Sequence, residues 1–335
     1  MAMLETLVLS DEEVRHLISM GEVIEAVEFA FREKGMGRIQ MPPKTYLFFD
    51  RYDGDLRTMP SYIEAIDVAA VKIVNAHIEN RDRYGLPTVM ATIILIDPKN
   101  GFPLAIMGGT SITNMRTGAA GGIAAKYLAR NESKVIGFIG AGTQAKMQLT
   151  ALIEVFKSFD EIRVWDINER NMRAFKGEMD AKYGNICQIK TVNVPEDAVR
   201  GADIVVTATP SRRPLVMDEW VSPGTHLNCI GADAPGKQEV DPRILKRSKI
   251  VVDDLEQAAH SGEINVPLRM GIISKADIWA ELGEIIVGKK PGRTWRDEIT
   301  VFVSTGLAIQ DAVTANLAYK RALEKGVGRR IRIAL

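Results

Sequence analysis

A glycine-rich segment that follows an apolar run has the residue types and spacing of a dinucleotide-binding turn. Residues 134–139 (KVIGFI) lead directly into residues 140–145 (GAGTQA), which fit the pattern GxGxxA, and a helix-compatible stretch follows. In this pattern Gly140 permits a tight turn, Gly142 lets the backbone approach a pyrophosphate, and Ala145 allows the helix to pack closely on the strand. The helix N-terminus adds unpaired amides and a partial positive charge. The segment therefore predicts a strand, a phosphate-binding turn and a helix.

A carboxylate after the next strand-like run indicates which dinucleotide would bind. The run 162–165 ends in Asp166, 26 residues after Gly140, where a carboxylate can accept hydrogen bonds from both ribose hydroxyls of the adenosine. The same carboxylate would repel a 2′-phosphate, and no basic residue follows until Arg170. These residues predict NAD rather than NADP as the cofactor. A glycine turn that binds nothing is the alternative, and the position of Asp166 argues against it.

A second glycine pattern, at residues 231–237, fits GxxxxGK, the start of a nucleoside-triphosphate loop. Gln238 stands where that loop needs Ser or Thr for magnesium, and Pro242 follows where its helix should run. The segment instead follows the strand-like run 226–230, so we expect it at the carboxyl edge of a sheet, where α/β proteins bind ligands. Asp233 is thus a candidate site residue, although a turn-forming aspartate is the simpler reading.

Lys72 is the one cation in the apolar run 69–74. A lysine can act as an acid or base near neutral pH once burial and neighbouring cations lower its pKa. From the residues alone, Lys72 could equally be an ordinary strand lysine whose ammonium lies in solvent.

The four histidines lie at least 34 positions apart, and neither cysteine belongs to a CxxC pair. We therefore predict no metal site.

Two kinds of scaffold are expected to position these residues. Between residues 119 and 306, short β-branched runs alternate with helical stretches, which is typical of parallel strands buried on both faces. This pattern predicts an α/β fold, with a Rossmann-type doubly wound parallel sheet as the NAD-binding domain over residues 119–306. The strands are expected at 135–139, 162–165, 203–208, 226–230, 250–252 and 300–303.

The two ends of the chain follow a different pattern. A capping box at residues 10–13 starts a helical pair, and strand-like runs then predict a mixed α+β sheet. A small-residue helix is expected to begin at Gly118 and to end near Arg130, whereas the helix over residues 306–325 has no strand partner left. We therefore expect residues 1–118 with 307–335 to form one catalytic and dimerisation domain. The strand-like runs are 45–49, 69–74 and 88–96.

The composition excludes several classes of protein. Lys plus Arg (43) equals Asp plus Glu (43), so no global field attracts a nucleic acid or an anionic membrane. Two cysteines are too few for a disulfide framework, and no apolar run approaches the roughly 20 residues of a membrane span. The N-terminus lacks the basic region of a secretion signal. We expect a cytoplasmic protein with no nucleic-acid or membrane partner.

Taken together, the motifs resemble the ornithine cyclodeaminase/mu-crystallin family, and within it the archaeal-type NAD-dependent alanine dehydrogenases. The resemblance implies a homodimer, built by a catalytic domain that both chain ends form. The resemblance covers nearly the whole chain. The matching segments are residues 40–44, 54–60, 71–75, 116–120, 140–145, 230–238, 251–254 and 304–308.

The resemblance also implies roles for individual residues. The family's catalytic lysine falls on Lys72 and its catalytic aspartate on Asp233. Lys72 would exchange the proton, and Asp233 would orient water and stabilise positive charge at the iminium carbon. Arg57 and Lys44 would hold the substrate carboxylate, although as isolated residues both read as surface charges. The cofactor-binding positions are Arg116, Gly140, Gly142, Thr143, Gln144, Ala145, Asp166, Ile167, Asn168, Ser211, Gly231, Ala232 and Ser304.

Some of these implications stay open. Arg116 matches a position that can meet either the cofactor pyrophosphate or the substrate carboxylate, and we assign it to the cofactor first. The implied reaction is oxidative deamination of the amino acid L-alanine to pyruvate and ammonia, together with its reversal. A cyclodeaminase that converts ornithine to proline and retains NAD, a ketimine or imino-acid reductase, and a non-enzymatic binding protein are the alternatives. Arg57 stands where the ornithine enzymes carry an acidic residue, and a buried arginine would repel a second substrate ammonium.

Overall fold

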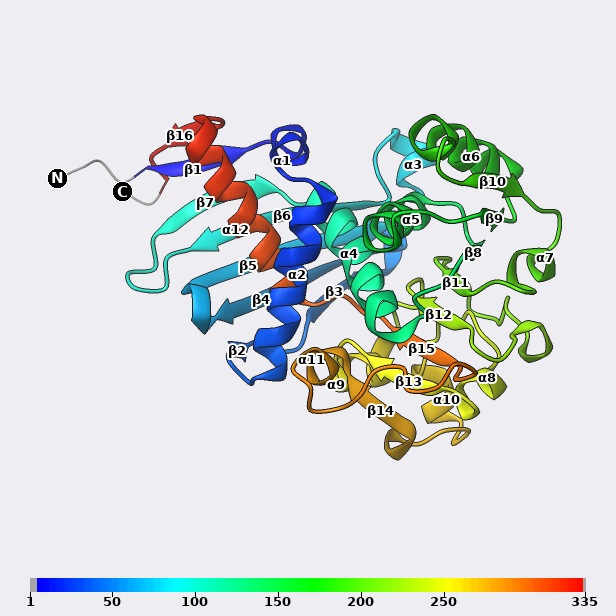
Figure 1. The fold of residues 1–335 in the computed structure, drawn as a ribbon. Helices are drawn as coiled ribbons and strands as arrows, with labels where there is room; N and C mark the ends of the chain where they lie inside the picture. Colours follow the sequence, from blue (N-terminus) through cyan, green and yellow to red (C-terminus); the bar gives the residue numbers. More distant parts are fainter. Residues whose placement is uncertain (1–4, 334–335) are drawn as a thin grey trace. The chain divides into compact units, whose positions relative to one another are not determined.

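The computed structural model describes residues 5–333, without the side chains of Arg81 and Asp82. The chain divides into two compact units (Figure 1). The first contains the chain up to Arg116 and again from Leu307, and the second contains Thr117–Gly306. The sequence placed the boundary after residue 118. The roles predicted for the units, dimerisation and NAD binding, stay predictions.

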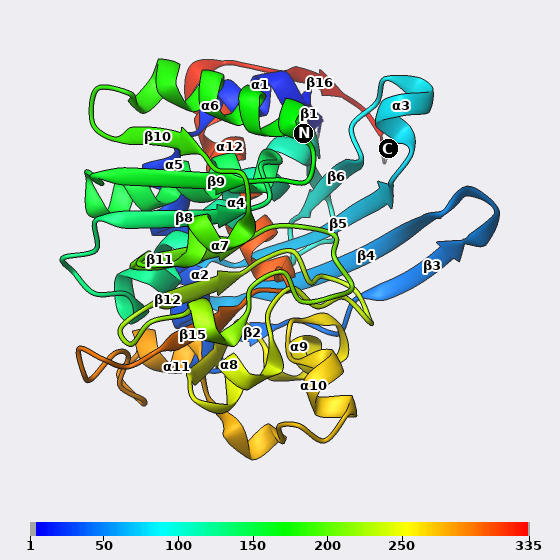
Figure 2. The ribbon, with the colours of Figure 1, turned by 90° about the vertical axis from the view of Figure 1, so that its right-hand side faces the viewer.

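The second unit is built on one parallel sheet of eight strands in the order β10-β9-β8-β11-β12-β15-β13-β14. Figure 2 shows β9, β8, β11 and β12 side by side in this layer. The chain starts at β8, runs outward to β10 and returns to β11, so the strand order reverses beside β8. This arrangement confirms the predicted doubly wound parallel sheet. The strands are β8 (Val135–Ile139), β9 (Glu161–Trp165), β10 (Gln188–Thr191), β11 (Ile204–Thr207), β12 (His226–Cys229), β13 (Lys249–Val252), β14 (Ile278–Glu281) and β15 (Thr300–Val303).

Strand residues of this sheet alternate between two apolar layers. Phe138 and Val206 contribute to one layer, where Phe138 packs on Phe175 with 5.5 Å between ring centroids, whereas Val205 and Leu227 contribute to the other. Because both faces are covered, the inner strands read as continuous apolar runs. The sequence missed β10 and β14, which form the two edges and carry polar or half-exposed residues. The helices are α5 (Thr143–Phe156), α6 (Glu169–Tyr183), α7 (Pro195–Val199), α8 (Pro242–Lys246), α9 (Leu255–Ser261), α10 (Asn265–Arg269) and α11 (Leu282–Ile286).

The first unit is built on a mixed sheet in the order β16-β1-β7-β6-β5-β4-β2. β3 pairs with the first half of β4, residues 54–58. Figure 1 shows α12 lying across the central strands of this sheet, and α2 packs beside α12. The C-terminal helix therefore returns to the N-terminal sheet, as its lack of a strand partner had indicated. The strands are β1 (Thr6–Leu9), β2 (Ile39–Gln40), β3 (Thr45–Phe49), β4 (Gly54–Ile63), β5 (Val68–His77), β6 (Val89–Ile96), β7 (Pro103–Gly108) and β16 (Arg329–Ile331). The helices are α1 (Asp11–Leu17), α2 (Met20–Gly35), α3 (Asn80–Tyr84) and α12 (Ala308–Lys325).

Local capping signals begin the first two helices. The predicted box is present: the Glu13 amide donates to Ser10 Oγ over 3.2 Å, and the Glu13 carboxylate accepts from the Ser10 amide over 2.7 Å. Ser19 and Glu22 form a second box at the start of α2. Such paired bonds satisfy amides that a helix start leaves unpaired.

One helix begins earlier than the sequence predicted. The helix expected from Gly118 to near Arg130 is α4 (Thr110–Leu128), which crosses the boundary between the units. Its first two turns are rich in Thr, Ser and Asn, which have low helix propensity because their side chains compete for backbone hydrogen bonds. Tertiary contacts override that preference, because the Ser111 amide and hydroxyl donate to Asp11 and Thr110 Oγ1 accepts from the Ala91 amide.

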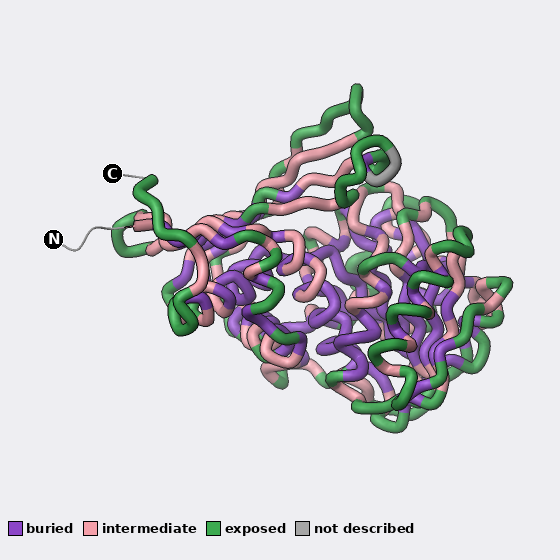
Figure 3. The backbone as a smooth tube through the Cα atoms, turned by 90° about the horizontal axis from the view of Figure 1, so that it is seen from above, coloured by how far each residue is buried: buried purple, intermediate pink, exposed green. Residues whose placement is uncertain are grey.

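The register of the first sheet separates a covered face from an open one. Met59, Lys72, Ile93 and Met107 lie side by side on β4, β5, β6 and β7, and all four are buried. The neighbouring row, Pro60, Val71, Ile94 and Ile106, is only half-buried. Because strand side chains alternate, the first row faces the helices and the second faces away from them. Figure 3 colours the backbone by burial, with buried segments in purple, half-buried segments in pink and exposed segments in green.

No membrane-spanning helix is found in the part of the chain that the structure describes, since none there is both long enough and apolar enough.

Candidate active site

A buried ionic cluster surrounds Lys72 in the first unit. The Lys72 side chain is 1% exposed, and its Nζ lies 2.7 Å from Asp311 Oδ2 and 3.5 Å from Thr113 Oγ1. Arg116 Nε donates to the other Asp311 oxygen over 2.9 Å, and Arg116 Nη1 donates to Gln310 Oε1 over 3.2 Å. One carboxylate therefore bridges a lysine and an arginine away from solvent.

Three elements bring this cluster together. β5 holds Lys72 in the apolar row beneath the helices, and α12 places Asp311 over it from its first turn. An acidic residue there also benefits from the positive end of the helix dipole. α4 contributes Thr113 and Arg116, which share one side of the helix because they are three residues apart.

This environment changes the acidity of Lys72. Burial, together with the charges of Arg116 and Lys44, lowers the pKa of Lys72 to about 7, while Asp311 opposes this shift by favouring the ammonium form. A lysine with that pKa can take up or release a proton near neutral pH. The structure thus supports the acid/base chemistry that an isolated cation in an apolar strand suggested.

Arg57 lies on the same face of the sheet as Lys72. It pairs in register with Val74 and stands two residues before Met59, which is opposite Lys72. Its guanidinium donates to Asp55 Oδ2 from Nη2 (2.7 Å) and from Nε (3.1 Å). Lys44 is the residue before β3 and acts electrostatically on Lys72. The first unit therefore gathers all four predicted cations, Lys44, Arg57, Lys72 and Arg116.

The glycine turn of the second unit has the conformation that its residues predict. Gly140 adopts φ +101°, and a Cβ there would lie 2.6 Å from the Ala208 carbonyl oxygen. At Gly142 an added Cβ would meet nothing within 4 Å, which leaves open space beside the start of α5. Gly142 is the N-cap of α5 and has no side chain to bind the first amides of that helix. Ala145 is fully buried against the sheet. These features fit a pyrophosphate at the helix N-terminus.

Asp166 links this turn to the end of β9. Its Oδ2 accepts from the Ala141 amide over 2.8 Å, and its Oδ1 accepts from the Asn168 amide over 2.8 Å. Asn168 in turn caps α6, and Ile167 is 91% exposed. Oδ1 also accepts from Asn171 Nδ2 over 3.4 Å. A carboxylate oxygen has two lone pairs, so Oδ2 keeps acceptor capacity for a ribose hydroxyl.

Asp233 lies in a loop that several side-chain bonds hold in place. Its Oδ1 accepts from Lys237 Nζ over 2.5 Å, and the Gly236 amide donates to Asn265 Oδ1 over 2.9 Å. Gly236 has φ +80°, and the next helix begins only at Pro242. The loop therefore does not lead into a helix as a nucleoside-triphosphate loop would. Its lysine, Lys237, donates to Asp233.

The other predicted cofactor residues follow strands of the second unit. Parallel strands share one carboxyl edge, so residues that follow them gather there. Ser304 follows β15 directly, and the amides after it, of Thr305 and Gly306, donate to Asp253 over 2.6 and 2.8 Å. The remaining residues in these positions are Thr143, Gln144, Ser211, Gly231 and Ala232.

Asp311, the partner of Lys72, was not among the site residues predicted from the sequence. The residue lies 195 positions from Arg116, and nothing in its own helix distinguishes it from an ordinary first-turn acid. Only the return of α12 to the first sheet reveals its role. Within residues 5–333, no three His, Cys, Asp or Glu side chains are grouped as ligands for a metal ion.

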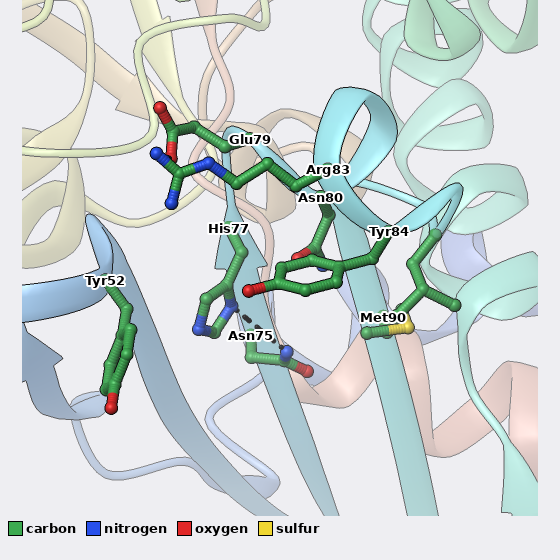
Figure 4. A pocket seen from close by; sticks show the side chains of 9 residues that line it. Tyr52, Asn75, His77, Glu79, Asn80, Arg83, Tyr84 and Met90 are labelled. Carbon is green, nitrogen blue, oxygen red and sulfur yellow. Dashed lines mark hydrogen bonds and ion pairs between the residues drawn. The ribbon is translucent and has the colours of Figure 1, made fainter.

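A pocket of about 380 Å³ also lies in the first unit, at the end of β5 (Figure 4). Asn75 and His77 line it and are joined by a hydrogen bond of 3.4 Å. Both are an odd number of residues from Lys72 along β5, so their side chains point to the other face of the sheet. The pocket is thus not the place where the predicted site residues meet.

Comparison with known proteins places this site in a family. The sequence model of the ornithine cyclodeaminase/mu-crystallin family matches residues 4–326. Alanine dehydrogenase of Archaeoglobus fulgidus is 52% identical over 332 residues, which cover 98% of this chain and 99% of that protein. The ketimine reductase mu-crystallin of Rattus norvegicus is 35% identical over 92% of this chain and 95% of its own length.

Solved structures agree with the sequence relatives. An archaeal alanine dehydrogenase dimer with bound NAD has a TM-score of 0.93 at 52% identity, covering 98% of this chain and 100% of that one. The Δ1-pyrroline-2-carboxylate reductase of Thermococcus litoralis, in complex with NADH and L-proline, has a TM-score of 0.93 at 46% identity, covering 97% and 99%. This chain, with its buried lysine cluster and its glycine turn, belongs to the ornithine cyclodeaminase/mu-crystallin family.

Proposed function

We propose that this chain is an NAD-dependent alanine dehydrogenase, which deaminates L-alanine oxidatively to pyruvate and ammonia and catalyses the reverse reductive amination. The observation that carries this proposal is the full-length similarity, at 52% identity, to an alanine dehydrogenase. The titratable Lys72, with Arg57 on the same sheet face, supports it independently.

The reaction assigns a task to each group. NAD, held by the Gly140 turn and Asp166, supplies the hydride acceptor when bound. Lys72 takes a proton from the substrate nitrogen or from the attacking water, and Asp233 orients that water and stabilises the positive iminium carbon. Arg57 grips the substrate carboxylate with its planar guanidinium, and Lys44 adds a point charge. Asp55 holds the guanidinium of Arg57 in place.

Arg116 keeps two possible roles in this scheme. We assigned it to the cofactor pyrophosphate, and it also lies in the Lys72 cluster through Asp311. From there its charge lowers the pKa of Lys72. A position beside the acid/base also suits contact with the substrate carboxylate, so the assignment to the cofactor stays a prediction.

A second candidate function is the reduction of a cyclic imino acid. The observation in its favour is the similarity to the pyrroline-carboxylate reductase structure at 46% identity. Both reactions exchange a hydride at the carbon beside a carboxylate, so the same cations and the same lysine would serve either one. An ornithine cyclodeaminase is less favoured, because Arg57 brings a positive charge to the face where its second substrate ammonium would lie.

Product analysis separates these functions. Incubation with NAD and alanine should accumulate NADH, which is followed by absorbance, whereas a cyclodeaminase would convert ornithine to proline without net NADH. NADH consumption with Δ1-pyrroline-2-carboxylate, in the absence of any alanine turnover, would overturn our main proposal and establish the second.

We also infer that the chain forms a homodimer through the open face of its first sheet. That face presents the half-buried row Pro60, Val71, Ile94 and Ile106, and the β3–β4 hairpin adds the exposed Leu47, which pairs with Leu56 on the same face. A contiguous apolar surface of this kind is typical of an interface. The archaeal relative of known structure is a dimer.

A cytoplasmic location without nucleic-acid partners stays a prediction.

Replacing Lys72 should affect catalysis and not binding. Lys72→Met keeps the bulk of the stem and removes the titrating amine, so kcat for alanine should fall by roughly 10²- to 10⁴-fold while NAD affinity changes little. Arg57→Met removes a carboxylate contact and should chiefly raise the KM for alanine. Steady-state kinetics of both variants, with NADH binding as a check on folding, measures the contrast. Near-normal kcat in Lys72→Met would make Asp233 the leading candidate for the base.

The pH dependence should report the pKa of Lys72. Oxidation needs the neutral amine, so kcat for alanine should rise with pH and level off above about 7, while reductive amination should decline over the same range. Asp311 favours the ammonium form, so Asp311→Asn should move the midpoint to lower pH, and Arg116→Gln should move it to higher pH. Identical midpoints in wild type and both variants would rule out Lys72 as the titrating group.

Asp166 should select NAD over NADP. Replacing Asp166 with Ser and Ile167 with Arg removes the repelling carboxylate and adds a cation, so the ratio of kcat/KM for NADP to that for NAD should rise. Parallel assays with both cofactors at equal low concentration test this. Equal use of NADP and NAD by the wild type would contradict the assignment.

The oligomeric state tests the open face. Sedimentation at micromolar concentration should give about twice 36.9 kDa for the wild type. Ile73→Glu puts a charge on the open face and should yield monomers, because an unpaired charge is costly to bury. Met36→Glu, at the end of α2, changes a similarly exposed apolar residue (45% against 36%) and should stay dimeric. A fully active wild-type monomer would refute the inference.

A further inference from the structure

The carboxylate of Glu239 lies fully buried at the carboxyl edge of the second sheet, where β11 and β12 end. Its Oε1 accepts from the amide of Thr209 over 2.6 Å and from the Thr209 hydroxyl over 2.8 Å. Its Oε2 accepts from the amide of Gly231 and from the Thr207 hydroxyl, each over 2.8 Å. Each oxygen thus binds one loop amide, and a single carboxylate joins the loop after β11 to the loop after β12.

These two loops pack backbone against backbone, and the dinucleotide turn packs on one of them. A Cβ on Gly231 would lie 2.2 Å from the Thr209 carbonyl oxygen, and a Cβ on Gly140 would lie 2.6 Å from the Ala208 carbonyl oxygen. A displacement of residues 208–209 would therefore move both the Gly140 turn and Gly231. Asp233 follows closely, because its amide donates to the Gly231 carbonyl over 3.0 Å.

The backbone of Glu239 is itself anchored. Its amide and that of Val240 both donate to Glu263 Oε1 over 2.8 Å, and its carbonyl accepts from the Leu215 amide over 2.7 Å. Glu263 is also fully buried, and burial with repulsion from Glu239 raises the pKa of Glu263. Glu263 therefore supports the backbone around Glu239, whereas Glu239 binds the loops.

We propose that Glu239 is a positioning residue of the active site, which locks the β11 and β12 loops so that Asp233 and the Gly140 turn keep fixed places in the second unit. Its effect on turnover rests on the proposed function, since Asp233 and the turn act in that reaction. No role for Glu239 was predicted from the sequence.

Glu239→Gln tests the proposal with almost no change in volume. A hydroxyl can turn to accept from the new amide group, but a backbone N–H cannot, so either Thr209 or Gly231 loses its acceptor. We expect faster hydrogen exchange in the peptides containing residues 207–212 and 228–236. We also expect kcat for alanine to fall on the order of 10- to 100-fold and the Kd for NADH to rise, because displaced groups lose their alignment. The KM for alanine should change little, since Arg57 and Lys44 belong to the first unit.

Glu263→Gln is the matched control. It is equally buried, and one amide oxygen in the Oε1 position can still accept from both backbone amides. Only the longer branch of the Glu239 amide bond, 3.0 Å to Oε2, is lost. It should therefore keep wild-type loop exchange, kcat and NADH affinity. If Glu239→Gln is not recovered folded, Thr209→Val replaces it, because at nearly constant shape it removes the hydroxyl that donates to Glu239 Oε1 and accepts from the Ser211 amide. That variant should show the same changes, with kcat lower by a few-fold.

The outcomes separate this proposal from the proposed function. Wild-type exchange in both loops, or wild-type kcat and NADH affinity, in Glu239→Gln or its substitute would overturn the positioning role. An equal loss in Glu263→Gln would overturn it too, because the effect would then be general destabilisation. Faster exchange and weaker NADH binding, in a protein whose wild type does not oxidise alanine, would support the positioning role and overturn the alanine reaction.

Discussion

The ammonium of Lys72, buried in an apolar row of the first sheet, is the constraint on which the rest of that unit depends. Transferring a charge from water into such a row costs several kcal/mol unless a counter-charge and hydrogen bonds accompany it. Asp311 supplies the counter-charge at 2.7 Å. Because Asp311 lies at the start of α12, the C-terminal helix must return to the N-terminal sheet, which is why both ends of the chain build one unit.

The charge balance around Lys72 suits chemistry better than stability. Asp311 alone would favour the ammonium, but Arg116 shares its carboxylate and Lys44 adds a second repelling charge. Burial, helped by these cations, lowers the pKa of Lys72 to about 7, where the group can exchange a proton. A buried ion pair is weak evidence for stability, so we interpret the cluster as a catalytic feature.

The second unit solves a different problem, the positioning of loops. Its parallel strands deliver the Gly140 turn, Asp166 and Asp233 to one edge of the sheet, as doubly wound folds do. The loops there approach so closely that Gly140 and Gly231 have no room for a Cβ. Backbone amides at such contacts need an acceptor, and Glu239 provides it for two loops at once. Rigid loops keep catalytic and cofactor groups aligned.

The sequence by itself determined what depends on neighbours along the chain. The inner strands read as apolar runs because both their faces are covered, and the Gly140 turn and Asp166 are recognisable from local spacing, as is Lys72 from its apolar neighbours. Local rules failed at the polar edge strands β10 and β14 and at the Thr- and Ser-rich start of α4. Only the tertiary structure decided the partnerships of Lys72 with Asp311 and of Glu239 with two loops. Those residues are far apart in sequence or unremarkable in their own segments, and they meet because a buried charge or an unpaired amide needs a partner.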